Sequence, residues 1–194
     1  MRKSFIAMVA LTIAPSLALT STIFAQGAPA TAQQASAKSS ALDDPTIVAI
    51  FDEANTADIE TGTLAMQKGH SKEVRDFGAM LARDHKQVRQ LGRDLASKLG
   101  VTPTPPVPDA GLSAHQATME SLRKLSGEAF DHAFLQHEVA FHKAVIDAVN
   151  STLLPAIQNA EVKALVVKVA PAFQAHMLAA AALDNKLQGK KGAN

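Results

Sequence analysis

Four long stretches of the chain repeat their apolar residues every three or four positions, which is the period of one helix face. They cover residues 45–68, 71–99, 128–150 and 159–187, and a shorter stretch with the same period covers residues 113–125. The clearest face belongs to the second stretch, at Val74, Phe77, Leu81, Val88, Leu91, Leu95 and Leu99. No alternating strand pattern competes with these stretches, so the sequence predicts an all-α protein.

The breaks between the stretches carry residues that end helices. Gly69 and Gly100 follow the first two stretches, and four prolines within residues 103–108 prevent a helix there. Asp44 followed by proline matches a helix N-cap, and Pro171 predicts a kink inside the last stretch. Short turns favour antiparallel neighbours, so the predicted architecture is an antiparallel four-helix bundle with an extra short helix.

The two ends of the chain differ from the predicted domain at residues 43–188. Residues 1–25 contain Arg2, Lys3, an apolar run and then small residues, which is the layout of a secretory signal peptide. The apolar run is too short for a membrane-spanning helix, although a short N-terminal membrane anchor is the alternative. Residues 26–42 are poor in bulky side chains and predict a flexible leader, and residues 189–194 predict a flexible tail. The expected location is secreted and periplasmic.

Composition narrows the classes of function. The chain has 19 Lys and Arg against 18 Asp and Glu, well mixed, so no nucleic acid or anionic membrane surface is expected as a partner. It has no cysteine, which excludes disulfides, thiolate metal sites and a lipoprotein anchor. No transmembrane segment is expected after signal removal, and the partners that remain are an envelope protein or a second copy of the chain.

Each long helix also places ionisable groups on its apolar face. At about 100° per residue, Asp131, Glu138 and His142 lie in the middle of the face of residues 128–150, whereas His132 and His137 project away from it. The other three helices contribute further inward groups: Asp58, Asp84, His85 and His176. Burying such groups unpaired costs several kcal/mol each, so they must pair with one another, with water or with an ion.

Three interpretations of these inward groups stay open: a polar network that fixes helix register, a metal site, and an acid–base site. The candidate metal ligands are Asp58, His85, Glu138, His142 and His176, with Asp84 and Asp131 assigned to a polar network. Counting about 1.5 Å per residue, Asp131 and His176 come out about 10 Å beyond the others. We therefore expect two polar layers as an alternative to one site. Asp131 also lies in a first helical turn, where the helix dipole favours a carboxylate.

Four strings, in order and over about residues 45–187, resemble a family of bacterial secreted proteins, the domain of unknown function family 4142. The strings are ADIETGTLA, VRDFGAMLARDHKQ, LSGEAFDHAFLQHEVAFHKAV and APAFQAHML. The resemblance implies a ferritin-like four-helix fold, a periplasmic or outer-membrane-associated location, and no established activity. The family's recurrent polar residues fall on Asp58, Asp84, His85, Asp131, His142 and His176. The family more often has Glu at Asp58, so a ligand there is shorter by one methylene.

Two functions from different classes follow. Di-iron ferritin-like enzymes use Glu-x-x-His ligands, whereas this chain has only Glu138-x-x-x-His142, so a standard ferroxidase is not expected. The favoured function is a non-enzymatic envelope or stress-related module whose inward polar residues form a structural network. The alternative is a metal-binding, redox-active ferritin-like protein that holds a divalent ion such as Zn, Fe, Cu or Ni.

Overall fold

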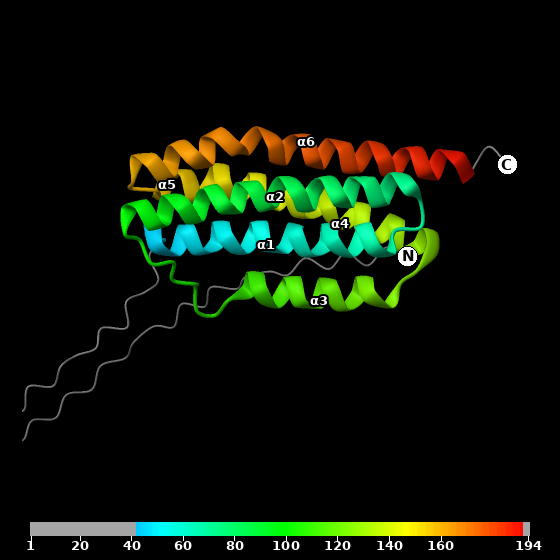
Figure 1. Ribbon diagram of the computed structural model, residues 1–194, viewed down its shortest axis with the longest axis horizontal. Helices are drawn as coiled ribbons and strands as arrows, with labels where there is room; N and C mark the ends of the chain where they lie inside the picture. Colours follow the sequence, from blue (N-terminus) through cyan, green and yellow to red (C-terminus); the bar gives the residue numbers. More distant parts are fainter. Residues whose placement is uncertain (1–41, 192–194) are drawn as a thin grey trace, which may run out of the picture. The chain divides into compact units, whose positions relative to one another are not determined.

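The computed structural model describes residues 42–191, and the regular structure in this range is entirely helical (Figure 1). The elements are α1 (Asp44–Lys68), α2 (Lys72–Leu99), α3 (Ala110–Lys124), α4 (Gly127–Ala148), the π-helical turn η1 (Val149–Leu153), α5 (Leu154–Ala156) and α6 (Ala160–Lys191). The all-helical class predicted from the sequence is therefore confirmed. The predicted signal peptide and almost all of the predicted leader lie outside the described residues.

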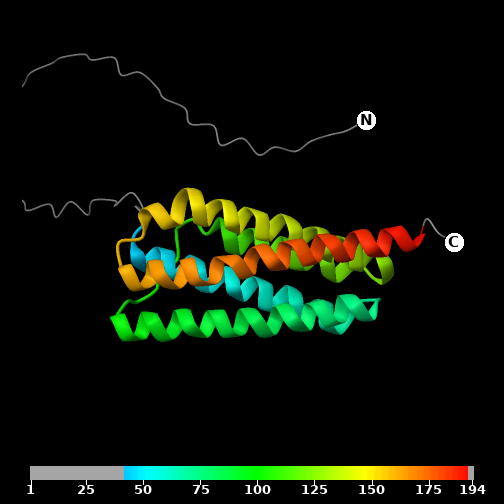
Figure 2. The same cartoon turned by 90° about the horizontal axis from the view of Figure 1, so that it is seen from above.

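The four long helices pack in two pairs, α1 with α2 and α4 with α6 (Figures 1 and 2). The pairs meet where α2 contacts α6 and α1 contacts α4, and α3 lies outside them against α1 and α4. Following the colours in Figure 1, α1 and α6 run in one direction and α2 and α4 in the other. Each of these four helix pairs is therefore antiparallel.

The helix ends follow local sequence chemistry, with one correction at the start of α1. Asp43, not Asp44, is the N-cap, because its side chain accepts a hydrogen bond from the Thr46 amide at 3.0 Å. Asp44 lies inside the first turn, and its carboxylate accepts the amides of Gln158 and Asn159 at 2.9 and 2.8 Å. The predicted capping residue thus ties the start of α1 to the turn before α6.

The core contains two apolar clusters separated by a polar layer. One cluster contains Ile47, Val48, Ala96, Val149, Ile157, Val162 and Val166. The other contains Ala65, Val74, Phe77, Leu81, Leu122, Phe130, Phe134, Leu135 and Ala180. Along every long helix, the buried ionisable residues predicted near the helix middle fall between these two clusters. The apolar clusters therefore shield the polar layer from water at both ends.

The last helix is longer and more apolar than a typical surface helix. α6 continues through Pro171 and ends at Lys191, past the predicted domain boundary. By length and composition alone, its residues Ala160–Gly189 would suffice to span a membrane. One face of this helix is buried in the core, whereas Val167 and Leu178 on its other side are exposed. The buried residues are Val162, Val166, Val169, Phe173, His176 and Ala180.

Candidate functional site

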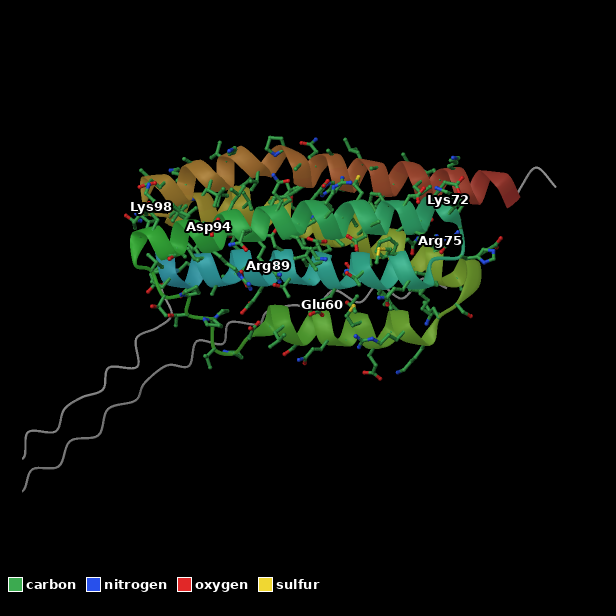
Figure 3. The ribbon with its side chains drawn as sticks, in the orientation of Figure 1. Glu60, Lys72, Arg75, Arg89, Asp94 and Lys98 are labelled. Atoms are coloured by element: carbon green, nitrogen blue, oxygen red, sulfur yellow. The ribbon has the colours of Figure 1, made fainter. Side chains whose placement is uncertain are left out.

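Five inward side chains from the four long helices lie together in the polar layer. They are Asp58 from α1, His85 from α2, Glu138 and His142 from α4, and His176 from α6, each with at most 7% of its surface exposed. The charged residues on the outer side of α2, such as Lys72, Asp94 and Lys98, are in contrast exposed (Figure 3). Helical periodicity placed these five residues on the inward faces of their helices, and all five are buried in the structure.

The expected 10 Å displacement of His176 from the other four residues is wrong. Its Nδ1 lies 3.2 Å from Nε2 of His85. The expectation assumed that the third helix ends near residue 150, whereas the chain stays helical through η1 and α5 to Ala156. Six additional helical residues lengthen the helical segment after His142 by about 9 Å, and this brings the middle of α6 level with His142.

Asp131 is separate from this cluster, as its helical position suggested. Its two carboxylate oxygens accept the main-chain amides of His70 and Ser71 at 2.7 and 2.8 Å. These amides belong to the turn between α1 and α2, so Asp131, the fifth residue of α4, joins the N-terminal part of this helix to that turn. Its role in the described structure is to pair these amides, which would otherwise lack a partner.

Two polar residues that the sequence reasoning missed hold the histidine and carboxylate groups in place. The side-chain oxygen of Asn55 accepts a hydrogen bond of 3.0 Å from Nδ1 of His85. The side-chain nitrogen of Asn55 donates a hydrogen bond of 2.7 Å to the Phe51 carbonyl. Thr61 donates to Oε1 of Glu138 over 2.8 Å. Both residues lie one turn from Asp58 on the same buried face, so the helical projection that found Asp58 could have found them.

Asp84 and His142 make further polar contacts in this layer. Oδ2 of Asp84 lies 3.4 Å from Nε2 of His176, at the edge of the site, where the Asp84 side chain is 34% exposed. Nδ1 of His142 donates to the main-chain carbonyl of Glu138 over 3.0 Å, and its Nε2 lies 3.9 Å from Oδ1 of Asp58. Asp84 thus connects the buried histidines to the surface.

Three buried polar atoms in this layer have no hydrogen-bond partner. They are Oδ1 of Asp58, Oε2 of Glu138 and Nε2 of His142, and in residues 42–191 the only other buried side-chain atom in this state is Nδ1 of His115. Leaving one such group unsatisfied costs about 1–3 kcal/mol. Ligand atoms of Asp58, Glu138 and His142 lie within 4.8 Å of one another, as do ring nitrogens of His85, His142 and His176. Both sets are compatible with a bound metal ion.

Burial sets the protonation states of these groups. It lowers the pKa of His85 to about 3 and that of His142 to about 4, and it also lowers the pKa of His176, so the rings are neutral at pH 7. Burial raises the pKa of Glu138 to about 7, although the hydrogen bond from Thr61 opposes this change. Burial and the neighbouring Glu138 carboxylate raise the pKa of Asp58 well above its usual range. The site therefore offers neutral imidazoles beside carboxyls that hold a proton near neutrality.

Replacing Glu138 with Gln should change the pH dependence of stability. A carboxyl whose pKa is raised in the folded state stabilises the fold fully below its unfolded pKa of about 4.5, and this contribution is lost as pH rises through about 7. Relative to Glu138→Gln, wild type should lose about 1.4 kcal/mol per pH unit between pH 4.5 and 7. Urea melts of metal-free protein across this range measure the difference, and a difference independent of pH would contradict the assignment.

The two other histidines of α4 lie outside this cluster but are less exposed than a surface position implies. Nδ1 of His132 lies 2.7 Å from Oδ1 of Asp184 on α6, and 44% of the His132 side chain is exposed. His137 is half-buried, and burial together with nearby His115 of α3 lowers its pKa to about 4. The covering helix α3 explains the burial of His137, and the contact with α6 explains that of His132, because a projection of α4 alone includes neither helix.

Comparison with known proteins identifies one family. The profile of a domain of unknown function, DUF4142, matches residues 28–183, which includes every residue of the polar layer. No curated protein and no solved structure matches the chain significantly. The resemblance noted from the four sequence strings is thereby confirmed, and the chain belongs to the DUF4142 family of unknown function.

Proposed function

We propose that this protein binds one divalent transition-metal ion in the buried polar layer. The proposal rests on two observations about Asp58, Glu138 and His142, which come from two helices. Each has an unpaired buried atom, and ligand atoms of the three residues lie within 4.8 Å of one another. A cation between them pairs all three atoms at once, and imidazole with carboxylate is a common ligand combination in helical bundles. His85 and His176 supply further nitrogen donors beside them.

A purely structural network explains these contacts less well. A proton between Asp58 and Glu138 satisfies the two carboxyls, but Nε2 of His142 then still lacks a partner within the described residues. Three neutral histidines in one layer are also more than helix register requires, because two apolar clusters already flank the layer. The geometry therefore favours the metal-binding function over the structural network that the sequence alone favoured.

The chain topology supports a ferritin-like bundle as the setting of this site. The connection from α2 to α4 runs back along the whole bundle through α3, so α4 runs parallel to α2 (Figure 1). A single long crossover between two antiparallel helix pairs is the connection used by ferritin-like folds. We propose the same fold here, in a secreted, periplasmic protein whose N-terminal signal peptide is removed. We propose no catalytic residue.

Metal analysis tests the proposal directly. Protein purified without a histidine tag and titrated calorimetrically with Zn²⁺, Cu²⁺, Ni²⁺ or Fe²⁺ should bind one ion per chain. His142→Leu should lose this binding, because His142 supplies one of the unpaired atoms. His132→Leu is the matched control, since His132 is an α4 histidine outside the layer. If wild type binds none of the four ions, the structural network remains as the explanation of the layer.

A further inference from the structure

Hydrogen-bond partners fix which nitrogen of His85 carries its hydrogen. The Asn55 amide group donates to the Phe51 carbonyl, and this leaves the Asn55 oxygen facing Nδ1 of His85. An amide oxygen only accepts hydrogen bonds, so Nδ1 of His85 carries the hydrogen. The lone pair of the neutral ring is therefore on Nε2, the atom that faces His176.

The same reasoning fixes the other two rings. Nδ1 of His142 faces a main-chain carbonyl, so it carries the hydrogen and the lone pair lies on the unpaired Nε2. Nε2 of His176 lies 3.4 Å from Oδ2 of Asp84, and the other oxygen of this carboxylate, Oδ1, lies 2.9 Å from the Arg83 guanidinium. Nε2 of His176 therefore carries the hydrogen, and its lone pair is on Nδ1.

These assignments bring lone pairs together without a hydrogen between them. Nε2 of His85 and Nδ1 of His176 are 3.2 Å apart, a hydrogen-bond distance, yet both are acceptors in these tautomers. Two nitrogen ligands at about 2.0–2.1 Å from a tetrahedral zinc ion are about 3.3 Å apart, which matches this separation. A nitrogen of His142 lies within 4.8 Å of nitrogens of both rings. Nitrogens of the three rings thus lie around one position that suits a cation.

We propose that the metal ion is held by three imidazole nitrogens, Nε2 of His85, Nε2 of His142 and Nδ1 of His176. This inference rests on the proposed metal-binding function and specifies its ligands. A nitrogen-rich set selects Zn²⁺, Ni²⁺ or Cu²⁺ over Mg²⁺ and Ca²⁺, which prefer oxygen ligands. Asn55 and Asp84 are positioning residues, because each acts through the ring that it orients.

The first test uses wild type and needs no substitution. Long-range ¹H–¹⁵N NMR spectra of the Zn²⁺-bound, tag-free protein report which ring nitrogen of each histidine carries hydrogen. We expect hydrogen on Nδ1 of His85 and His142 and on Nε2 of His176. Hydrogen on Nε2 of His142, or on Nδ1 of His176, would overturn the proposed ligand set.

The second test changes a positioning residue and leaves the ligands intact. Asp84→Asn presents an amide group that can donate to Nε2 of His176 and so favours the wrong tautomer, and Zn²⁺ affinity should fall about 10–100-fold. Asp76→Asn is the matched control, because Asp76 is an exposed carboxylate of the same helix paired with Lys72. Unchanged affinity in Asp84→Asn, or an equal fall in Asp76→Asn, would contradict the role of Asp84.

Failure of this inference is distinguishable from failure of the proposed function. If Zn²⁺ binding is lost in His142→Leu but unchanged in both His85→Leu and His176→Leu, the ion lies on the carboxylate side. The three-histidine set is then wrong while metal binding stands. Competition by Mg²⁺ at equal concentration would likewise exclude the nitrogen-rich set. If wild type binds no ion, both proposals fail.

Discussion

Zn²⁺ at a hundredfold excess over its Kd should raise the free energy of unfolding of the wild-type protein by about 2.7 kcal/mol relative to protein in EDTA. This gain follows from mass action, because the layer exists only in the folded chain and the unfolded chain lacks it. His142→Leu should abolish the gain. Thermal melts of both proteins with EDTA and with each candidate ion measure it. An equal gain in the variant would place the ion elsewhere, on half-exposed His132 or His137.

The same gain should shrink as pH falls below about 7. A cation in the layer lies beside the carboxyl of Glu138, whose pKa is raised to about 7, and that of Asp58, whose pKa is raised well above its usual range. Its charge favours their ionised forms, so binding must release their protons. The cause is not histidine protonation, because the pKa values of His85 and His142 are about 3 and 4 in the folded protein. Affinity should fall about tenfold per pH unit for each displaced proton. Melts at pH 7.5 and 5.5 test this, and an unchanged gain would contradict it.

Gly78→Ala should destabilise the domain by about 2–3 kcal/mol, at the upper end of the usual overpacking cost. A Cβ atom at residue 78 would lie 2.6 Å from the Gly62 carbonyl oxygen and 2.8 Å from both the Ala65 Cβ and the Met66 amide nitrogen. Two of these are backbone atoms of α1, so α1 and α2 must move apart. The better helix propensity of alanine, about 1 kcal/mol, offsets only part of this cost.

Gly189→Ala provides the control for that prediction. It lies in α6, and a Cβ atom there would have no neighbour within 4 Å. Only the difference in helix propensity between glycine and alanine applies here, so this variant should be as stable as wild type or slightly more stable. Urea melts of both variants separate close helix packing from propensity. A Gly78→Ala protein as stable as wild type would show that α1 and α2 approach less closely than described.

The sequence by itself determined the helices and their inward faces. Helix formation depends on neighbours three and four residues apart, and caps such as Asp43 and Ser71 act within a single turn. For the same reason, the projection of one helix identified Asp58 and His142 as inward residues without knowledge of the partners. The one-residue error at Asp44 also has a local cause, because two adjacent aspartates precede the same proline.

Only the tertiary structure decided which inward residues meet. His176 joins His85 because the chain stays helical through η1 and α5, a continuation past residue 150 that the apolar period of the third helix did not reveal. Asp131 instead pairs with amides of a turn that is distant in sequence. The tautomers of His85 and His176 likewise depend on Asn55 and Asp84, which contact these rings from other helices. Such contacts are set by helix length, crossover and packing between elements, and these are properties of the assembled helices that no single helical pattern contains.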